Sequence, residues 1–98
     1  MLRAGDLSLD PAAHRVWRGE TEVALSPREL ALLEVFMRHP GEVLSRLALL
    51  EGAWDHSYEN RSNVIDVYVR YLRDKIDRPF GVETLETVRG AGYRLRGH

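Results

Sequence analysis

The chain has no cysteine, which excludes a disulfide, a thiolate metal site and a cysteine nucleophile. This absence fits a reducing compartment, and we expect a cytoplasmic protein. The sequence also has no apolar run long enough to cross a membrane and no signal peptide after Met1, so no membrane partner is expected. The 98 residues, 44% hydrophobic and 30% charged, are typical of one globular domain over residues 1–98.

The signatures of an enzyme are missing as well. No glycine-rich phosphate loop follows a strand, and no G-x-S-x-G motif occurs. Asp55 and Glu59 are a carboxylate pair, but they lie in a polar segment without an apolar pocket. The histidines are scattered, without metal-ligand spacing, at His14, His39, His56 and His98. We therefore expect no catalytic residue, no metal site and no cofactor.

The chain has no net positive charge, but its positive residues outnumber the acidic ones near its C-terminal end. The formal net charge is −1. Residues 1–60 hold six arginines against ten acidic residues, a balance of −4. Residues 61–98 hold seven arginines and Lys75 against five acidic residues, a balance of +3. A polyanion would therefore be bound by a local field of the C-terminal part, not by the total charge.

The first 25 residues have the pattern of short strands. Leu7–Leu9 precedes the turn signal Asp10–Pro11. His14–Arg18 and Glu22–Leu25 flank Gly19 and Glu20, which predicts a hairpin with a three-residue connection. These segments predict a small antiparallel sheet with one face on the core.

Two helices are predicted next. Ser26, Pro27 and Glu29 form a capping box with proline at the first helical position, so a helix begins here and runs to about His39. Pro40 and Gly41 end it.

Ser45 is placed to cap a shorter helix that runs through Trp54, with Leu47, Leu50 and Trp54 at helical spacing. The polar connection Asp55–Arg61 follows, longer than the turn of a minimal helix-turn-helix.

The third predicted helix runs from about Ser62 to Ile76. Its buried stripe is Ile65, Val69, Leu72 and Ile76, at helical spacing. The opposite side carries Asn63, Val64, Val67, Arg70, Tyr71 and Asp74. Two valines and a tyrosine on an exposed face indicate a contact surface.

A β-hairpin is predicted at the C-terminus, from Leu85–Val88 and Tyr93–Arg96. Gly90 and Gly92 permit a tight turn that places Arg89 at the tip. A cation on a thin arm suits a DNA minor groove. The alternative is an ordinary hairpin with an exposed arginine.

The whole chain resembles the DNA-binding effector domain of the OmpR/PhoB family of two-component response regulators. The residues that carry the resemblance are L-S-P-R-E-L-A-L-L at 25–33, H-P-G-E-V-L-S-R at 39–46, N-V-I-D-V-Y-V-R-Y-L-R-D-K-I-D at 63–77 and E-T-V-R-G-A-G-Y-R-L at 86–95. The resemblance implies an α+β winged helix-turn-helix with a four-stranded N-terminal antiparallel sheet, three helices and a C-terminal hairpin wing.

The resemblance also implies a function and a set of partners. The third helix would enter the major groove of double-stranded DNA and the wing the adjacent minor groove, and two domains would bind a direct-repeat operator as a dimer on DNA, regulating transcription. An upstream receiver domain, phosphorylated by a sensor histidine kinase, is expected in a longer parent protein. The segment between the second and third helices would contact RNA polymerase through Asp55, His56, Ser57, Tyr58, Glu59 and Asn60.

Thirteen residues are the candidate DNA ligands: Trp54, Arg61, Ser62, Asn63, Val64, Val67, Tyr68, Arg70, Tyr71, Arg73, Thr87, Arg89 and Gly90. Several have a structural alternative. Arg70 and Arg73 contact phosphates or form helix-surface ion pairs, for instance Arg70 with Asp66 or Asp74. Asn63 and Ser62 contact DNA or cap the helix. Trp54 and Tyr68 contact phosphate or pack in the core.

The sequence departs from the family pattern at two places. Leu47 and Ala48 stand after the second helix cap, where polar residues are common, and Tyr71 stands where many members have arginine. Val64, Val67 and Tyr71 are the candidate base readers, and valine selects for a thymine methyl. The rival interpretation is a winged helix that docks a protein partner on this apolar face. The arginines of the third helix and the wing favour DNA.

Overall fold

The computed structural model describes residues 1–54 and 62–96. The first four strands are β1 (Leu2–Ala4), β2 (Leu7–Asp10), β3 (Arg15–Arg18) and β4 (Thr21–Val23). They form an antiparallel sheet in sequence order. β1 begins one residue from the start of the chain, in a stretch that no motif singled out.

The hairpin of this sheet differs slightly from the prediction. β3 begins at Arg15 because His14 has a φ of 56°, a left-handed conformation that belongs to the preceding turn. β4 ends at Val23, which pairs with Val16, and the connection is Gly19 and Glu20 alone. The predicted strands were therefore too long at their outer ends.

The two predicted helix starts are confirmed. Helix α1 (Pro27–Arg38) has both bonds of the capping box, Ser26 to the Glu29 amide and Glu29 back to the Ser26 amide. Helix α2 (Arg46–Ala53) begins where the Ser45 side chain accepts from the Ala48 amide. Trp54 is the residue that ends α2.

The long third helix changes character before its predicted end. Helix α3 (Ser62–Leu72) is followed by a π-helical turn, Arg73–Asp77, and a 3-10 turn, Arg78–Phe80. The predicted buried stripe is confirmed, since its four residues are at most 1% exposed: Ile65, Val69, Leu72 and Ile76. The wider turn is rare and is associated with functional sites.

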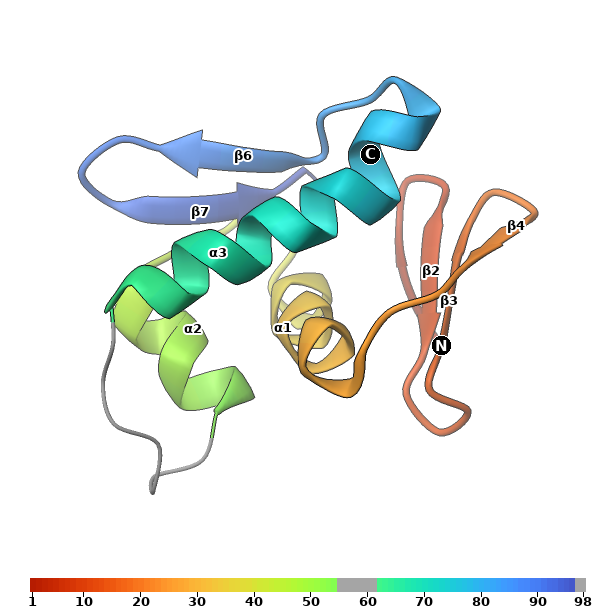
Figure 1. The fold of residues 1–98 in the computed structure, drawn as a ribbon, viewed down its shortest axis with the longest axis horizontal. Coiled ribbons are helices and arrows are strands. Elements are labelled where there is room, and N and C mark those ends of the chain that lie inside the picture. The colour runs from red at the N-terminus through yellow and green to blue at the C-terminus, as the bar shows by residue number, and fades with distance from the viewer. Residues whose placement is uncertain (55–61, 97–98) are drawn as a thin grey trace.

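The C-terminal hairpin is part of a second sheet. Strands β6 (Leu85–Val88) and β7 (Gly92–Leu95) form the predicted hairpin, and β5 (Val43–Leu44) pairs with β7 to give the order β5-β7-β6. The hairpin lies along α3, while the first sheet lies beyond α1 at the other end of the molecule (Figure 1). The α+β winged-helix architecture is thus confirmed, with β5 as an unpredicted third strand.

Candidate nucleic-acid interface

The outer side of α3 is the first part of the candidate interface. Asn63, Arg70 and Tyr71 are exposed, and Tyr71 keeps 43% of its surface. Val64, Val67 and Tyr68 are half-buried, and Val64 and Tyr68 also pack against the core. The candidate base readers therefore share one side of the helix, but the two valines present only part of their surface. Ser62 begins α3.

Three aromatic rings run in sequence from the end of α2 to this face. The centroid of the Trp54 ring lies 5.2 Å from that of Tyr68, and the Tyr68 centroid 5.4 Å from that of Tyr71, both edge to face. Arg28 of α1 stacks over Trp54 at 5.1 Å and donates to the carbonyl of Ala53. Trp54 itself is 6% exposed, so its ring packs in the core.

Arg70 has neither of the partners proposed as its alternative. Asp66 accepts from Arg46 of α2 at 2.9 Å and from the Tyr93 hydroxyl, while Asp74 pairs with Arg78. Within residues 1–54 and 62–96, Arg70 forms no hydrogen bond or ion pair, so its guanidinium is available to a ligand.

The tip of the wing is the second part of the candidate interface. Thr87, Arg89 and Gly90 are exposed, and the φ angles of Gly90 and Gly92 are 75° and 140°. The predicted need for glycine at both positions is confirmed.

Arg89 differs from the other two arginines of the hairpin. Arg94 and Arg96 both pair with Glu86, at 2.6 and 2.9 Å, and their hydrogen bonds lower the pKa of Glu86. Arg89 has no such partner among the described residues. The charge at the tip is therefore not compensated locally.

Arg73 lies between the helix and the wing. Its Nε donates to the carbonyl of Leu85 at 3.0 Å and its Nη2 to the hydroxyl of Thr87 at 2.8 Å. Its guanidinium also stacks over the Tyr93 ring at 5.7 Å. The side chain is half-buried and holds the wing against the helix. Its phosphate contact stays a prediction.

Tyr93 ties the middle strand of the second sheet to the same helix. Its hydroxyl donates to Asp66, and Arg46 stacks over its ring at 5.4 Å. Burial and the neighbouring Asp66 raise the pKa of Tyr93. The phenol is therefore a neutral donor at physiological pH.

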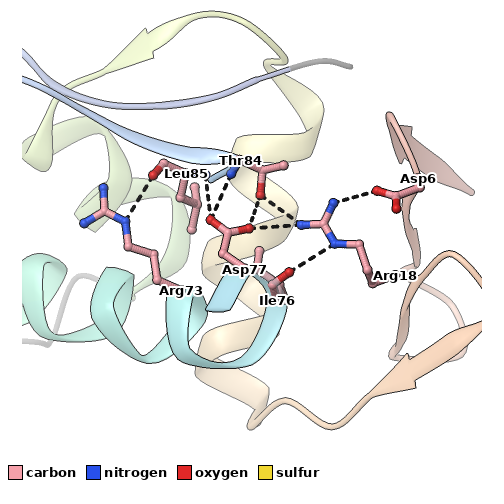
Figure 2. A network of polar contacts seen from close by, with 7 residues as sticks. All are labelled: Asp6, Arg18, Arg73, Ile76, Asp77, Thr84 and Leu85. Atoms are coloured by element: carbon pink, nitrogen blue, oxygen red, sulfur yellow. Dashed lines mark hydrogen bonds and ion pairs between the residues drawn. The ribbon is translucent and has the colours of Figure 1, made fainter. Parts of the chain in front are cut away.

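A buried polar network at the base of the wing was missed by sequence reasoning. Figure 2 shows Arg18 of β3 reaching Asp77, the last residue of the π turn, and Thr84, which directly precedes β6. Arg18 and Asp77 are 4% and 2% exposed. The alternation along β3 places Arg18 on the inner side, and this was the available signal.

Leu47 shares its helical spacing with Leu50 and Trp54 but not their burial. It is 55% exposed, because α2 turns Leu49, Leu50 and Ala53 toward the core. Trp54 remains buried through the aromatic contacts.

Arg61 and the segment Asp55–Asn60 lie outside the described residues. Among the residues that are described, no cluster of three or more His, Asp or Glu side chains is placed to hold a metal ion. In that same part of the chain, none of the helices has both the length and the apolar character required to span a membrane.

Comparison with known proteins gives consistent matches. Residues 20–95 match the family described as "Transcriptional regulatory protein, C terminal". The transcriptional regulatory protein TcrA of Mycobacterium tuberculosis is 66% identical over 95 residues, 97% of this chain and 38% of that protein. The phosphate regulon regulator PhoB of Rhizobium meliloti is 44% identical over 95 residues, 97% of this chain and 42% of that protein.

Among solved structures, the DNA-binding domain of RstA from Klebsiella pneumoniae, in complex with the RstA box, superposes with a TM-score of 0.85. It is 31% identical and the match covers 99% of this chain and 97% of that one. The chain spans less than half the length of the curated relatives it matches.

Proposed function

Because the chain belongs to the OmpR/PhoB family of response-regulator DNA-binding domains, we propose that it binds double-stranded DNA with α3 in the major groove and the wing in the adjacent minor groove. One observation carries this proposal. Arg70 on the outer side of α3 and Arg89 at the wing tip are both exposed, and neither has an ion-pair partner among the described residues. Two uncompensated guanidinium groups on neighbouring elements suit one polyanion better than an apolar partner.

The contacts divide into two kinds. Arg70 reaches a phosphate and fixes the register without reading sequence. The proposal has three further phosphate ligands. One is Arg73, which holds the wing, and the other two are Arg61 and Ser62 at the start of the helix. Thr87 and Gly90 bring the wing backbone close to the minor groove, where Arg89 enters.

Sequence is read by the other exposed residues of α3. Val64 and Val67 pack on thymine methyl groups, and the Tyr71 hydroxyl or the Asn63 amide bonds to a base edge. None of these side chains offers the fork that matches guanine, so we propose half-sites containing thymine at the positions facing the valines.

The assembly on DNA follows from the family and from the greater length of the relatives. We propose that a receiver domain precedes this domain in the full-length protein and is phosphorylated by a sensor histidine kinase. Two copies bind a direct-repeat operator as a dimer in the cytoplasm, and the Asp55–Asn60 segment contacts RNA polymerase.

The test is a salt titration of binding to a site selected from genomic fragments. Arg70→Ala and Arg89→Ala should each weaken binding by about 1–3 kcal/mol and reduce the slope of log K against log salt by about one unit. Arg15→Ala is the matched control, because Arg15 pairs with Glu22 on the first sheet, away from α3. Unchanged affinity in both α3 and wing variants, with the fold intact, would contradict the proposal and favour a protein-docking module.

A further inference from the structure

The base of the wing is held by two side chains of the π turn, four residues apart. Asp77 Oδ2 accepts from the amides of Thr84 and Leu85, at 2.9 and 3.0 Å. Arg73 donates to the carbonyl of Leu85 at 3.0 Å. Both backbone polar groups of Leu85 are thus bonded to side chains of the helix end, which fixes the direction in which β6 leaves it (Figure 2).

The carboxylate of Asp77 needs a counter-charge to do this, because it is only 2% exposed. A buried charge without a partner is costly. Arg18 Nη2 provides the charge at 3.0 Å and also donates to the hydroxyl of Thr84 at 2.9 Å. The same hydroxyl donates to Asp77, so three side chains form a closed network.

Arg18 comes from the opposite end of the fold. It lies on β3 of the first sheet, its Nη1 pairs with Asp6 at 2.6 Å and its Nε donates to the carbonyl of Ile76 at 3.0 Å. The first sheet therefore reaches the base of the wing through one side chain, 59 residues before Asp77 in the chain.

We propose that Arg18 is a positioning residue for DNA binding, which sets the direction of the wing through Asp77. Without Arg18, the Asp77 carboxylate is a buried charge without its counter-charge, so it turns toward solvent and releases the amides of Thr84 and Leu85. Arg89 lies four residues beyond Leu85, at a distance of about 13 Å along the strand. A tilt of about 10° at the base moves the tip by about 2 Å, more than a minor-groove contact tolerates.

The inference rests on the proposed role of the wing, so the experiment is a double-mutant cycle with Arg89. Arg18→Met should weaken binding to the selected site by about fivefold or more, and by less than about twofold when Arg89 is already alanine. Arg15→Met, on the same strand, should have no effect in either background. Amide exchange at Thr84 and Leu85 should rise in Arg18→Met relative to amides of α1.

The outcomes separate the two proposals. An equal loss with and without Arg89 would mean that Arg18 acts through overall stability, and would overturn this inference alone. No effect of Arg89→Ala by itself would overturn the minor-groove role and this inference with it. Where Arg18→Met does not fold, Arg18→Lys and Asp77→Asn enter the same cycle, because each keeps part of the network. If the loss of affinity in both variants simply adds to that of Arg89→Ala, the inference is again overturned.

Discussion

The rings of Tyr68 and Tyr71 meet edge to face on the outer side of α3, with their centroids 5.4 Å apart. Tyr68 is itself fixed by Trp54, which is 6% exposed and covered by Arg28. Tyr71 is 43% exposed, but one side of its ring packs against Tyr68, whose own position is set by Trp54. A side chain with few accessible rotamers loses little entropy when it binds, which suits a residue that reads bases.

Tyr71→Arg should shift the preferred half-site toward guanine. Arginine offers two parallel donors to the guanine edge, which tyrosine lacks. The measurement is a competition assay with guanine and thymine variants of a selected site, and Tyr71→Phe is the control, since it keeps the ring. An unmoved preference in Tyr71→Arg would mean that this position does not face a base.

Replacing thymine by uracil opposite Val64 or Val67 should cost on the order of 1 kcal/mol, the burial of one methyl-sized group. Base pairing and phosphates are unchanged by this replacement. Both valines are half-buried, so the loss of binding free energy should be smaller opposite the valine that exposes less of its side chain. Equal affinity for thymine and uracil sites at every position would exclude the valines as readers.

Gly92→Ala should destabilise the domain by more than about 2 kcal/mol. A Cβ at Gly92 would overlap the carbonyl oxygen of Leu44 and lie 3.0 Å from Ser45 Cα, so β5 would have to separate from β7. Gly90→Ala is the matched control: it also has a positive φ but its Cβ would meet no atom within 4 Å, so it should cost about 1 kcal/mol. Urea unfolding measures both, and equal losses would show that backbone conformation alone matters.

Stability should fall on acidification partly through Glu29. Burial alone would raise the pKa of Glu29, but hydrogen bonds from Lys75 and Ser26 and the charge of Lys75 together lower it. A lowered folded pKa means that the ionised group stabilises the fold above the ordinary glutamate pKa, and that this contribution is lost as the pH falls through the lowered value.

The variant that tests this is Glu29→Gln, which retains a capping side chain but not the charge. It should lower the free energy of unfolding by about 1 kcal/mol at pH 7. It should also make the free energy of unfolding fall less steeply as the pH is lowered into the acid range. Glu20→Gln, in the exposed β3–β4 turn, should leave the urea midpoint at pH 7 unchanged. If the free energy of unfolding of Glu29→Gln falls with pH as steeply as that of the original chain, the pH dependence belongs to other carboxylates.

Glu59→Ala should lower promoter activation while leaving operator affinity nearly unchanged. This follows from the proposed RNA polymerase contact of the segment between α2 and α3. Transcription in a reporter strain and binding of the purified domain give the two readings. Equal losses in both would indicate a DNA contact or a folding role instead.

Local signals carried most of the prediction of this fold. Ser26 and Ser45 mark helix starts because a cap bonds to amides two or three residues away, which the sequence displays directly. The buried stripe of α3 follows from its period. The exposed positions of Arg70 and Arg89 follow from the same local patterns.

What the sequence could not predict depends on contacts between distant segments. Strand β5 has two residues, and only its pairing with β7, some 50 residues later, makes it a strand. The contacts that tie Arg18 to the π turn and Arg73 to the hairpin join distant or separate elements, so neither could be chosen from spacing alone. Leu47 fits a helical stripe but points outward, because the core takes up the other side of α2.

Strand β6 is the outer strand of the second sheet, with β7 as its one neighbour there. An open strand edge can recruit another chain into the sheet. The amide and carbonyl of Leu85 on that edge are already bonded to Asp77 and Arg73. The π turn after α3 thus covers the start of this edge, so a domain in which the wing has separated from that turn exposes two more unpaired backbone groups on an open strand, which favours self-association.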